Sequence, residues 1–88
     1  MQTYQLFVGS NNKTSKLETA KIKRILTMQH NGFTIYSVNG CWKGNTEKTA
    51  AIIIHDVEKK VFSTIKKLKK ELHQDAIAYQ LIPKLNFA

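Results

Sequence analysis

The polar stretch at residues 9–16 has the side chains that bind anions. Its sequence, GSNNKTSK, follows an apolar strand-like run and precedes a helix-like pattern. Amide and hydroxyl groups donate hydrogen bonds to phosphate oxygens, lysines add charge, and a helix N-terminus presents free backbone N–H groups. We therefore predict a phosphate-binding loop made of Gly9, Ser10, Asn11, Asn12, Lys13, Thr14 and Lys16. The same residue types are also typical of a loop that only caps a helix, and no Walker-type Gly-rich motif is present.

A second candidate surface surrounds the only tryptophan. Trp42 lies between Gly40 and Gly44, with Lys43 beside it. An indole at a loop tip can stack on a nucleobase, and the neighbouring ammonium group would suit a phosphate. The alternative is that Cys41 and Trp42 continue a strand and cover one end of the core.

Catalytic groups are harder to find. The three histidines, His30, His55 and His73, are not sequence neighbours, and no His-x-Thr or His-x-Ser pair of a two-histidine phosphodiesterase occurs. The helix dipole explains His30 and His73, which are expected near helix C-termini, and a strand end followed by a helix cap explains His55. Cys41 is the single cysteine, and no Cys/His spacing predicts a metal or other cofactor. A binding protein is favoured over an enzyme, although a metal-independent reaction could use Tyr4, Tyr36, Tyr79, Glu47 and His55.

Length and charge narrow the class of protein. The 88 residues fit one domain, residues 1–88, and the net charge of +8 would attract anions. Polymer DNA or RNA is a poorer expectation than a small nucleotide, because no Arg-rich segment, RNA-recognition signature or helix-turn-helix is present. No apolar run approaches the roughly 20 residues of a membrane span, and the N-terminus does not resemble a signal peptide. We expect a cytoplasmic location and no membrane partner.

Alternating and β-branched runs predict four strands. They are expected at residues 3–8, 33–38, 49–56 and 76–82. The second and third strands should form a hairpin. Residues 39–40 and 43–45 are typical of turns or bulges and predict an elaborate tip for that hairpin.

Helical spacing of apolar residues predicts two helices. The first begins at a capping box of Ser15 and Glu18 and ends near Gly32. Asp56 is expected to cap the second helix, whose apolar stripe runs through residues 57–72.

The resulting order, βαββαβ, predicts an α+β protein with the ferredoxin-like split βαβ fold: a four-stranded antiparallel sheet with two helices on one face. The other face should then carry Gln5 and Phe7. From the last strand it should carry either Ile77, Tyr79 and Leu81 or Ala78, Gln80 and Ile82. Both alternatives leave apolar side chains on the open face, which predicts a homo-oligomer formed through that face.

The sequence also resembles small uncharacterised proteins encoded by bacteriophages and prophages. The resemblance rests on the segments YQLFVGSNNKT, GFTIYSVNGCWKG and LHQDAIAY and spans most of the chain. Several such proteins counter bacterial immunity by sequestering or degrading nucleotide second messengers. Position by position, the resemblance points to Gly9, Asn11, Thr14, Thr34, Tyr36, Gly40, Trp42, Glu47, Gln74 and Asp75.

Together these observations favour a protein that binds and sequesters a small phosphorylated nucleotide, such as a cyclic or dinucleotide messenger. The expected ligand contacts are the predicted phosphate-binding loop together with Tyr36, Trp42 and Lys43. The alternatives are a metal-independent phosphodiesterase that cleaves such a nucleotide and a basic inhibitor of an acidic protein partner.

Overall fold

The computed structural model describes residues 1–11 and 13–83, and only the backbone of Trp42. The elements are β1 (Gln2–Val8), α1 (Thr19–Gln29), β2 (Thr34–Trp42), β3 (Asn45–Asp56), α2 (Glu58–Glu71) and β4 (Ala78–Ile82). Their order is the predicted βαββαβ.

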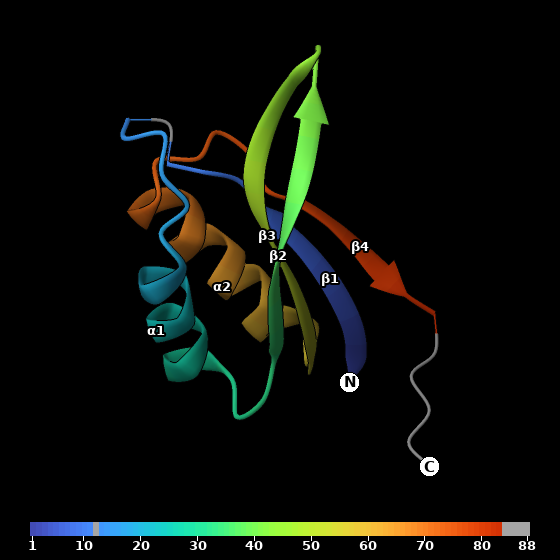
Figure 1. Cartoon of the computed structure of the whole chain (residues 1–88). Helices are drawn as coiled ribbons and strands as arrows, with labels where there is room; N and C mark the ends of the chain where they lie inside the picture. The colour runs from blue at the N-terminus through green and yellow to red at the C-terminus, as the bar shows by residue number, and fades with distance from the viewer. Residues whose placement is uncertain (12, 84–88) are drawn as a thin grey trace.

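The strands form one antiparallel sheet in the order β2-β3-β1-β4. Both helices cover the same face of this sheet (Figure 1). The predicted ferredoxin-like α+β fold is therefore confirmed. Neither helix of the described chain is long and apolar enough to cross a membrane.

The core lies between the sheet and the two helices. Apolar residues alternate along the central strands and recur at helical spacing, so that one face of each element is buried. The main contributors are Leu6, Val8, Ile52 and Ile54 from the sheet, Ile22, Ile25 and Leu26 from α1, and Val61, Ile65 and Leu68 from α2. Burying one such side chain contributes about 1.5–3 kcal/mol.

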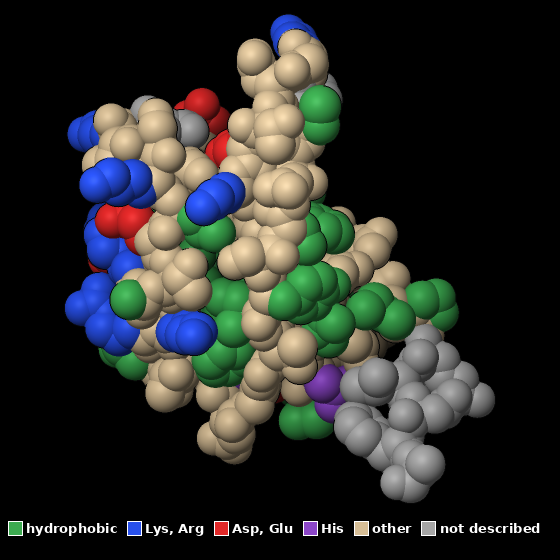
Figure 2. Space-filling view, viewed as in Figure 1, with side chains coloured by type: hydrophobic (Ala, Val, Ile, Leu, Met, Phe, Trp, Pro, Cys, Tyr) green, Lys and Arg blue, Asp and Glu red, His purple; other side chains and the backbone are tan. Residues whose placement is uncertain are grey.

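The open face is fixed by the strand register, because directly paired residues share a face. Phe7 pairs with Ala51 and Ala78, and Ala51 pairs in turn with Tyr36. Of the two alternatives for the last strand, the open face therefore carries Ala78, Gln80 and Ile82. Figure 2 shows hydrophobic side chains gathered over the sheet, whereas lysine and arginine side chains gather on the side of the helices.

Both helices begin differently from the prediction. The capping box is wrong: Ser15 has a φ of 60°, Glu18 is the N-cap of α1, and no side chain caps the helix. Glu18 instead accepts a hydrogen bond from Asn11. Asp56 is the last residue of β3, and Val57 occupies the N-cap of α2, so the second predicted cap is also wrong.

The β2–β3 hairpin has a tight tip, not an elaborate one. Pairing continues one-to-one without interruption from Thr34 to Trp42, so the predicted turn or bulge at 39–40 is wrong. The turn consists of Lys43 and Gly44, with φ values of 51° and 79°, the positive values that a two-residue hairpin turn needs. β1 pairs with β3 only from Ala50 onward, so the end of the hairpin projects beyond the rest of the sheet as a two-stranded ribbon, residues 38–49 (Figure 1).

Candidate functional site

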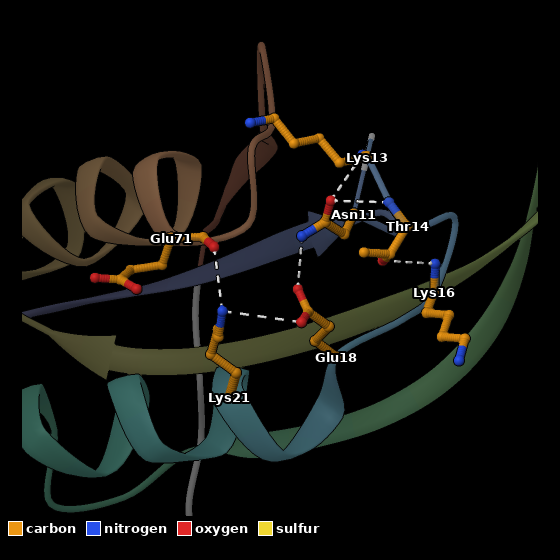
Figure 3. Close-up of polar contacts among 7 residues, drawn as sticks. All are labelled: Asn11, Lys13, Thr14, Lys16, Glu18, Lys21 and Glu71. Carbon is orange, nitrogen blue, oxygen red and sulfur yellow. Dashed lines mark hydrogen bonds and ion pairs between the residues drawn. The ribbon is translucent and has the colours of Figure 1, made fainter.

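Asn11 organises the loop that enters α1. Its side-chain oxygen accepts hydrogen bonds from the backbone N–H groups of Lys13 at 2.7 Å and Thr14 at 3.3 Å. Its amide nitrogen donates to Glu18 at 2.8 Å. These contacts, drawn in Figure 3, leave the residue only 4% exposed. The sequence predicts a ligand contact here, and the side chain holds its own loop together.

The other predicted loop residues do not converge on one point. The ammonium groups of Lys13 and Lys16 extend in different directions (Figure 3). The Thr14 hydroxyl accepts a hydrogen bond from the Lys16 backbone at 3.3 Å. Asn12 lies outside the described residues. Because α1 begins at Thr19, its free N–H groups lie beyond this stretch.

A cavity of about 640 Å³ lies beside this loop, and we call it the loop pocket. Its polar lining includes Ser10 and Lys16 from the loop and Glu47 and Lys48 from β3. The Ser10 hydroxyl donates to the backbone oxygen of Lys48 at 3.0 Å, which ties the loop to the ribbon. The loop pocket therefore offers two ammonium groups and one carboxylate.

A larger recess of about 950 Å³ opens on the other side of Glu47, and we call it the open-face pocket. It lies where the ribbon, the end of β1 and the connection from α2 to β4 meet. Its apolar wall includes Phe7, Val38 and Ala78. Five of the residues to which the family resemblance points line it: Gly9, Gly40, Glu47, Gln74 and Asp75. Its described lining contains two carboxylates and no lysine or arginine.

Ser10 links the three parts of this pocket through its backbone. Its N–H donates to Glu47 Oε1 at 2.7 Å, and its carbonyl oxygen accepts from Gln74 Nε2. Gly9 makes this approach possible, because a Cβ atom there would lie 2.6 Å from Glu47 Oε1. The second carboxylate oxygen of Glu47 and the side-chain oxygen of Gln74 accept no hydrogen bond from the described residues. The part of the pocket beside Gly9 can therefore offer these two oxygens to a ligand as hydrogen-bond acceptors.

The remaining predicted ligand residues lie elsewhere. Tyr36 is on the open face, 44% exposed, and its hydroxyl accepts a hydrogen bond from Gln5 at 3.1 Å. Lys43 is in the ribbon turn, and the backbone of Trp42 pairs with Asn45. The predicted set is thus spread over the loop, the sheet face and the ribbon tip. No motif singled out Phe7 or Thr49 as pocket residues, and only the strand register reveals them.

His30 is buried away from both pockets. His30 Nδ1 lies 2.7 Å from Asp56 Oδ2, and its Nε2 lies 2.7 Å from the Thr64 hydroxyl. The neutral imidazole satisfies both contacts when Nδ1 carries the proton. His30 is the C-cap of α1, near the helix C-terminus as expected, and this network joins the end of α1 to β3 and α2. The His30 hydrogen bond, supported by the Val57 N–H, lowers the pKa of Asp56.

The other groups considered for catalysis are also held in structural contacts. The His55 ring bonds to the Thr3 hydroxyl at 2.8 Å. Burial raises the pKa of the Tyr4 phenol, with Glu58 and Tyr79 acting in the same direction, which keeps the phenol protonated. Among the described residues, no group of three His, Cys, Asp or Glu side chains could hold a metal ion.

Comparison with known proteins identifies the fold. No family model and no curated protein matches the sequence. A protein of the DUF3240 family from Shewanella baltica OS155 superposes with a TM-score of 0.66 at 12% identity, covering 100% of this chain and 96% of its own. The periplasmic divalent cation tolerance protein CutA from Archaeoglobus fulgidus gives 0.60 at 13%, covering 98% and 87%. A phage SAM lyase in its apo state gives 0.54 at 19%, covering 90% and 78%.

At these identities the likeness is one of fold. The chain is thus similar to several small ferredoxin-like proteins, one of which comes from a phage.

Proposed function

We propose that the protein binds and sequesters a small nucleoside-containing molecule in the open-face pocket. The observation that carries this proposal is the pairing of an apolar wall with hydrogen-bond acceptors at one end. Phe7 and Val38 offer a surface for a base, and Glu47, Gln74 and Asp75 lie at the polar end. A mostly apolar recess with a few convergent polar groups is the usual form of a small-molecule site.

The charge of the pocket favours a ligand with a positive group. Two of the six acidic residues of the chain line this pocket, although the chain as a whole carries a charge of +8. S-adenosylmethionine (SAM) combines an adenosine with a sulfonium, an ammonium and a carboxylate group, so that its net charge is positive. One structural neighbour is a SAM lyase, and this supports SAM as the specific candidate. The oxygens of Glu47 and Gln74 would accept hydrogen bonds from the ammonium group.

Calorimetric titration with SAM tests this proposal. Glu47→Gln should weaken SAM binding about 10- to 150-fold, since a hydrogen bond to a charged group contributes about 1.5–3 kcal/mol. The glutamine oxygen still accepts from Ser10 N–H, so the fold should be retained. Glu71→Gln makes the same charge change on α2 and should leave binding unaltered. Equal affinity of the wild type and the Glu47 variant would contradict the proposal.

Recovery of the ligand separates binding from cleavage. Chromatography of SAM released by heating the complex should return it intact in a one-to-one amount. Conversion of excess SAM to products would contradict sequestration and would assign lyase activity to the same pocket.

A phosphorylated nucleotide in the loop pocket is the second candidate. The observation that favours it is the presence of Lys16 and Lys48 on the lining of that cavity, next to the hydroxyl of Ser10. Lys16→Ala and Lys48→Ala should then weaken binding of a cyclic dinucleotide and leave SAM binding unchanged. Asn11 is unsuited to this test, because its replacement would dismantle the loop.

Self-association through the open face belongs to the same proposal. Phe7 and Tyr36 are 36% and 44% exposed on this face, and Ile82 lies on the same face further along β4, opposite Thr3. Contact with a second copy would remove these side chains from water and narrow the entrance to the pocket.

A further inference from the structure

The outer edge of β4 carries apolar side chains on the side of the helices. β4 is the last strand of the sheet, so one of its backbone edges has no neighbouring strand in the described chain. Tyr79 and Leu81 are 50% and 49% exposed. Tyr79 packs edge-to-face on Phe62 of α2, with ring centroids 5.1 Å apart. The strand edge and α2 thus share one apolar surface.

Lysines surround this apolar surface. A cavity of about 510 Å³ along α2 is lined by Phe62 and by Lys59, Lys66 and Lys69. The spacing of three, four and three residues places these four side chains along one side of the helix. No acidic residue lines the cavity, and none of the three lysines forms an ion pair with a described residue. We call the cavity and the adjoining edge of β4 the basic groove.

We propose that the basic groove binds an extended acidic segment of a partner protein, which adds to the sheet as a strand beside β4. The three features of the groove match the three parts of such a segment. Its backbone would pair with the free edge of β4, its apolar side chains would pack on Phe62 and Tyr79, and its carboxylates would meet the lysines. This inference does not depend on the ligand of the open-face pocket.

The same features argue against two other occupants. A nucleic acid would meet the lysines and aromatic rings but would leave the strand edge unpaired. A second copy of this chain would bring the same lysines into contact with themselves. An acidic peptide is therefore the occupant that uses the backbone edge, the rings and the charges together.

Fluorescence anisotropy with a labelled peptide of repeating Glu-Thr-Leu-Thr, which places glutamate and leucine on one face of an extended chain, tests the inference. The wild type should bind it, and a peptide in which lysine replaces glutamate should not bind. The triple variant Lys59→Glu, Lys66→Glu, Lys69→Glu should lose at least tenfold in affinity. The matched variant Lys13→Glu, Lys23→Glu, Arg24→Glu carries the same net charge and should lose less than threefold. Equal losses in both variants would overturn the inference, since they would indicate general charge attraction.

Two further probes test the mode of binding. Alternate N–H groups of an added strand face β4, so two peptides are compared, each methylated on one of the two alternating sets of backbone nitrogens. One of the two should fail to bind, and unchanged affinity of both would overturn strand addition. A labelled oligothymidylate should fail to displace the bound peptide, and displacement would assign the groove to nucleic acid instead. Circular dichroism of each variant establishes that it is folded before affinities are compared.

Discussion

Replacing Gly9 with alanine should separate ligand binding from folding. The added Cβ would lie 2.6 Å from Glu47 Oε1 and 3.5 Å from the side-chain oxygen of Gln74. The first distance is too short for any contact, so the carboxylate must move away. Its hydrogen bond to Ser10 N–H, now 2.7 Å long, would then be lost. Glu47 is exposed, and its flexible side chain can move without disturbing the core.

The two expected losses differ in size. Folding loses one hydrogen bond worth about 1 kcal/mol, which lowers the melting temperature of a domain of this size by roughly 4–8 °C. Binding of SAM loses a positioned carboxylate worth about 1.5–3 kcal/mol, which raises the dissociation constant about 10- to 150-fold. Calorimetric titration with SAM at 25 °C measures the second loss on a folded protein.

Gly32→Ala is the matched control, because a Cβ atom at Gly32 would meet no atom within 4 Å. It should bind SAM as the wild type does. A folded Gly9→Ala variant with unchanged affinity for SAM would refute the reasoning that the Glu47 carboxylate holds the ligand.

Three further predictions concern stability and assembly. Thr64→Val leaves His30 Nε2 without its partner in the core and should destabilise by about 1–3 kcal/mol in thermal unfolding, whereas Thr27→Val on the exposed side of α1 should change stability much less. The folded-state pKa of Asp56 is lowered, so its contribution to stability is present above the ordinary carboxyl value of about 3.9 and is lost as the pH falls through the folded-state value. At pH values below about 4, the melting temperature should therefore decrease as the pH is lowered, and this decrease should be less steep in the Asp56→Asn variant. Light scattering at micromolar concentration should give a mass above the 10.1 kDa of one chain, and Phe7→Asp should return that single-chain mass.

The fold could be predicted because its signals are local. Alternation of Tyr4, Leu6 and Val8 identifies a strand with one buried face, and the apolar stripe of α2 identifies a helix with one buried side. Once the order βαββαβ is known, few topologies remain. The same alternation correctly placed Gln5 and Phe7 on the open face.

The helix starts and the candidate site could not be predicted in this way. Ser15 and Glu18 have the spacing of a capping box, but Glu18 bonds instead to Asn11, a contact that a local motif does not encode. The open-face pocket depends on partners 37 and 64 residues apart in the chain, Ser10 with Glu47 and Ser10 with Gln74. Only the strand register and the loop connections bring such residues together.

The net charge of +8 favoured an anionic ligand in the sequence analysis. Net charge, however, describes the whole chain and not the surroundings of one binding site. A binding site responds to the charges within about one Debye length, roughly 8 Å at physiological ionic strength. The charged residues that line the open-face pocket are Glu47 and Asp75, whereas those that line the loop pocket are Lys16, Lys48 and Glu47. Long-range repulsion from the basic surface opposes the approach of SAM and assists the approach of a nucleotide. Added salt screens both effects, so it should speed the association of SAM and slow that of a nucleotide, and the sign of this change distinguishes the two ligands.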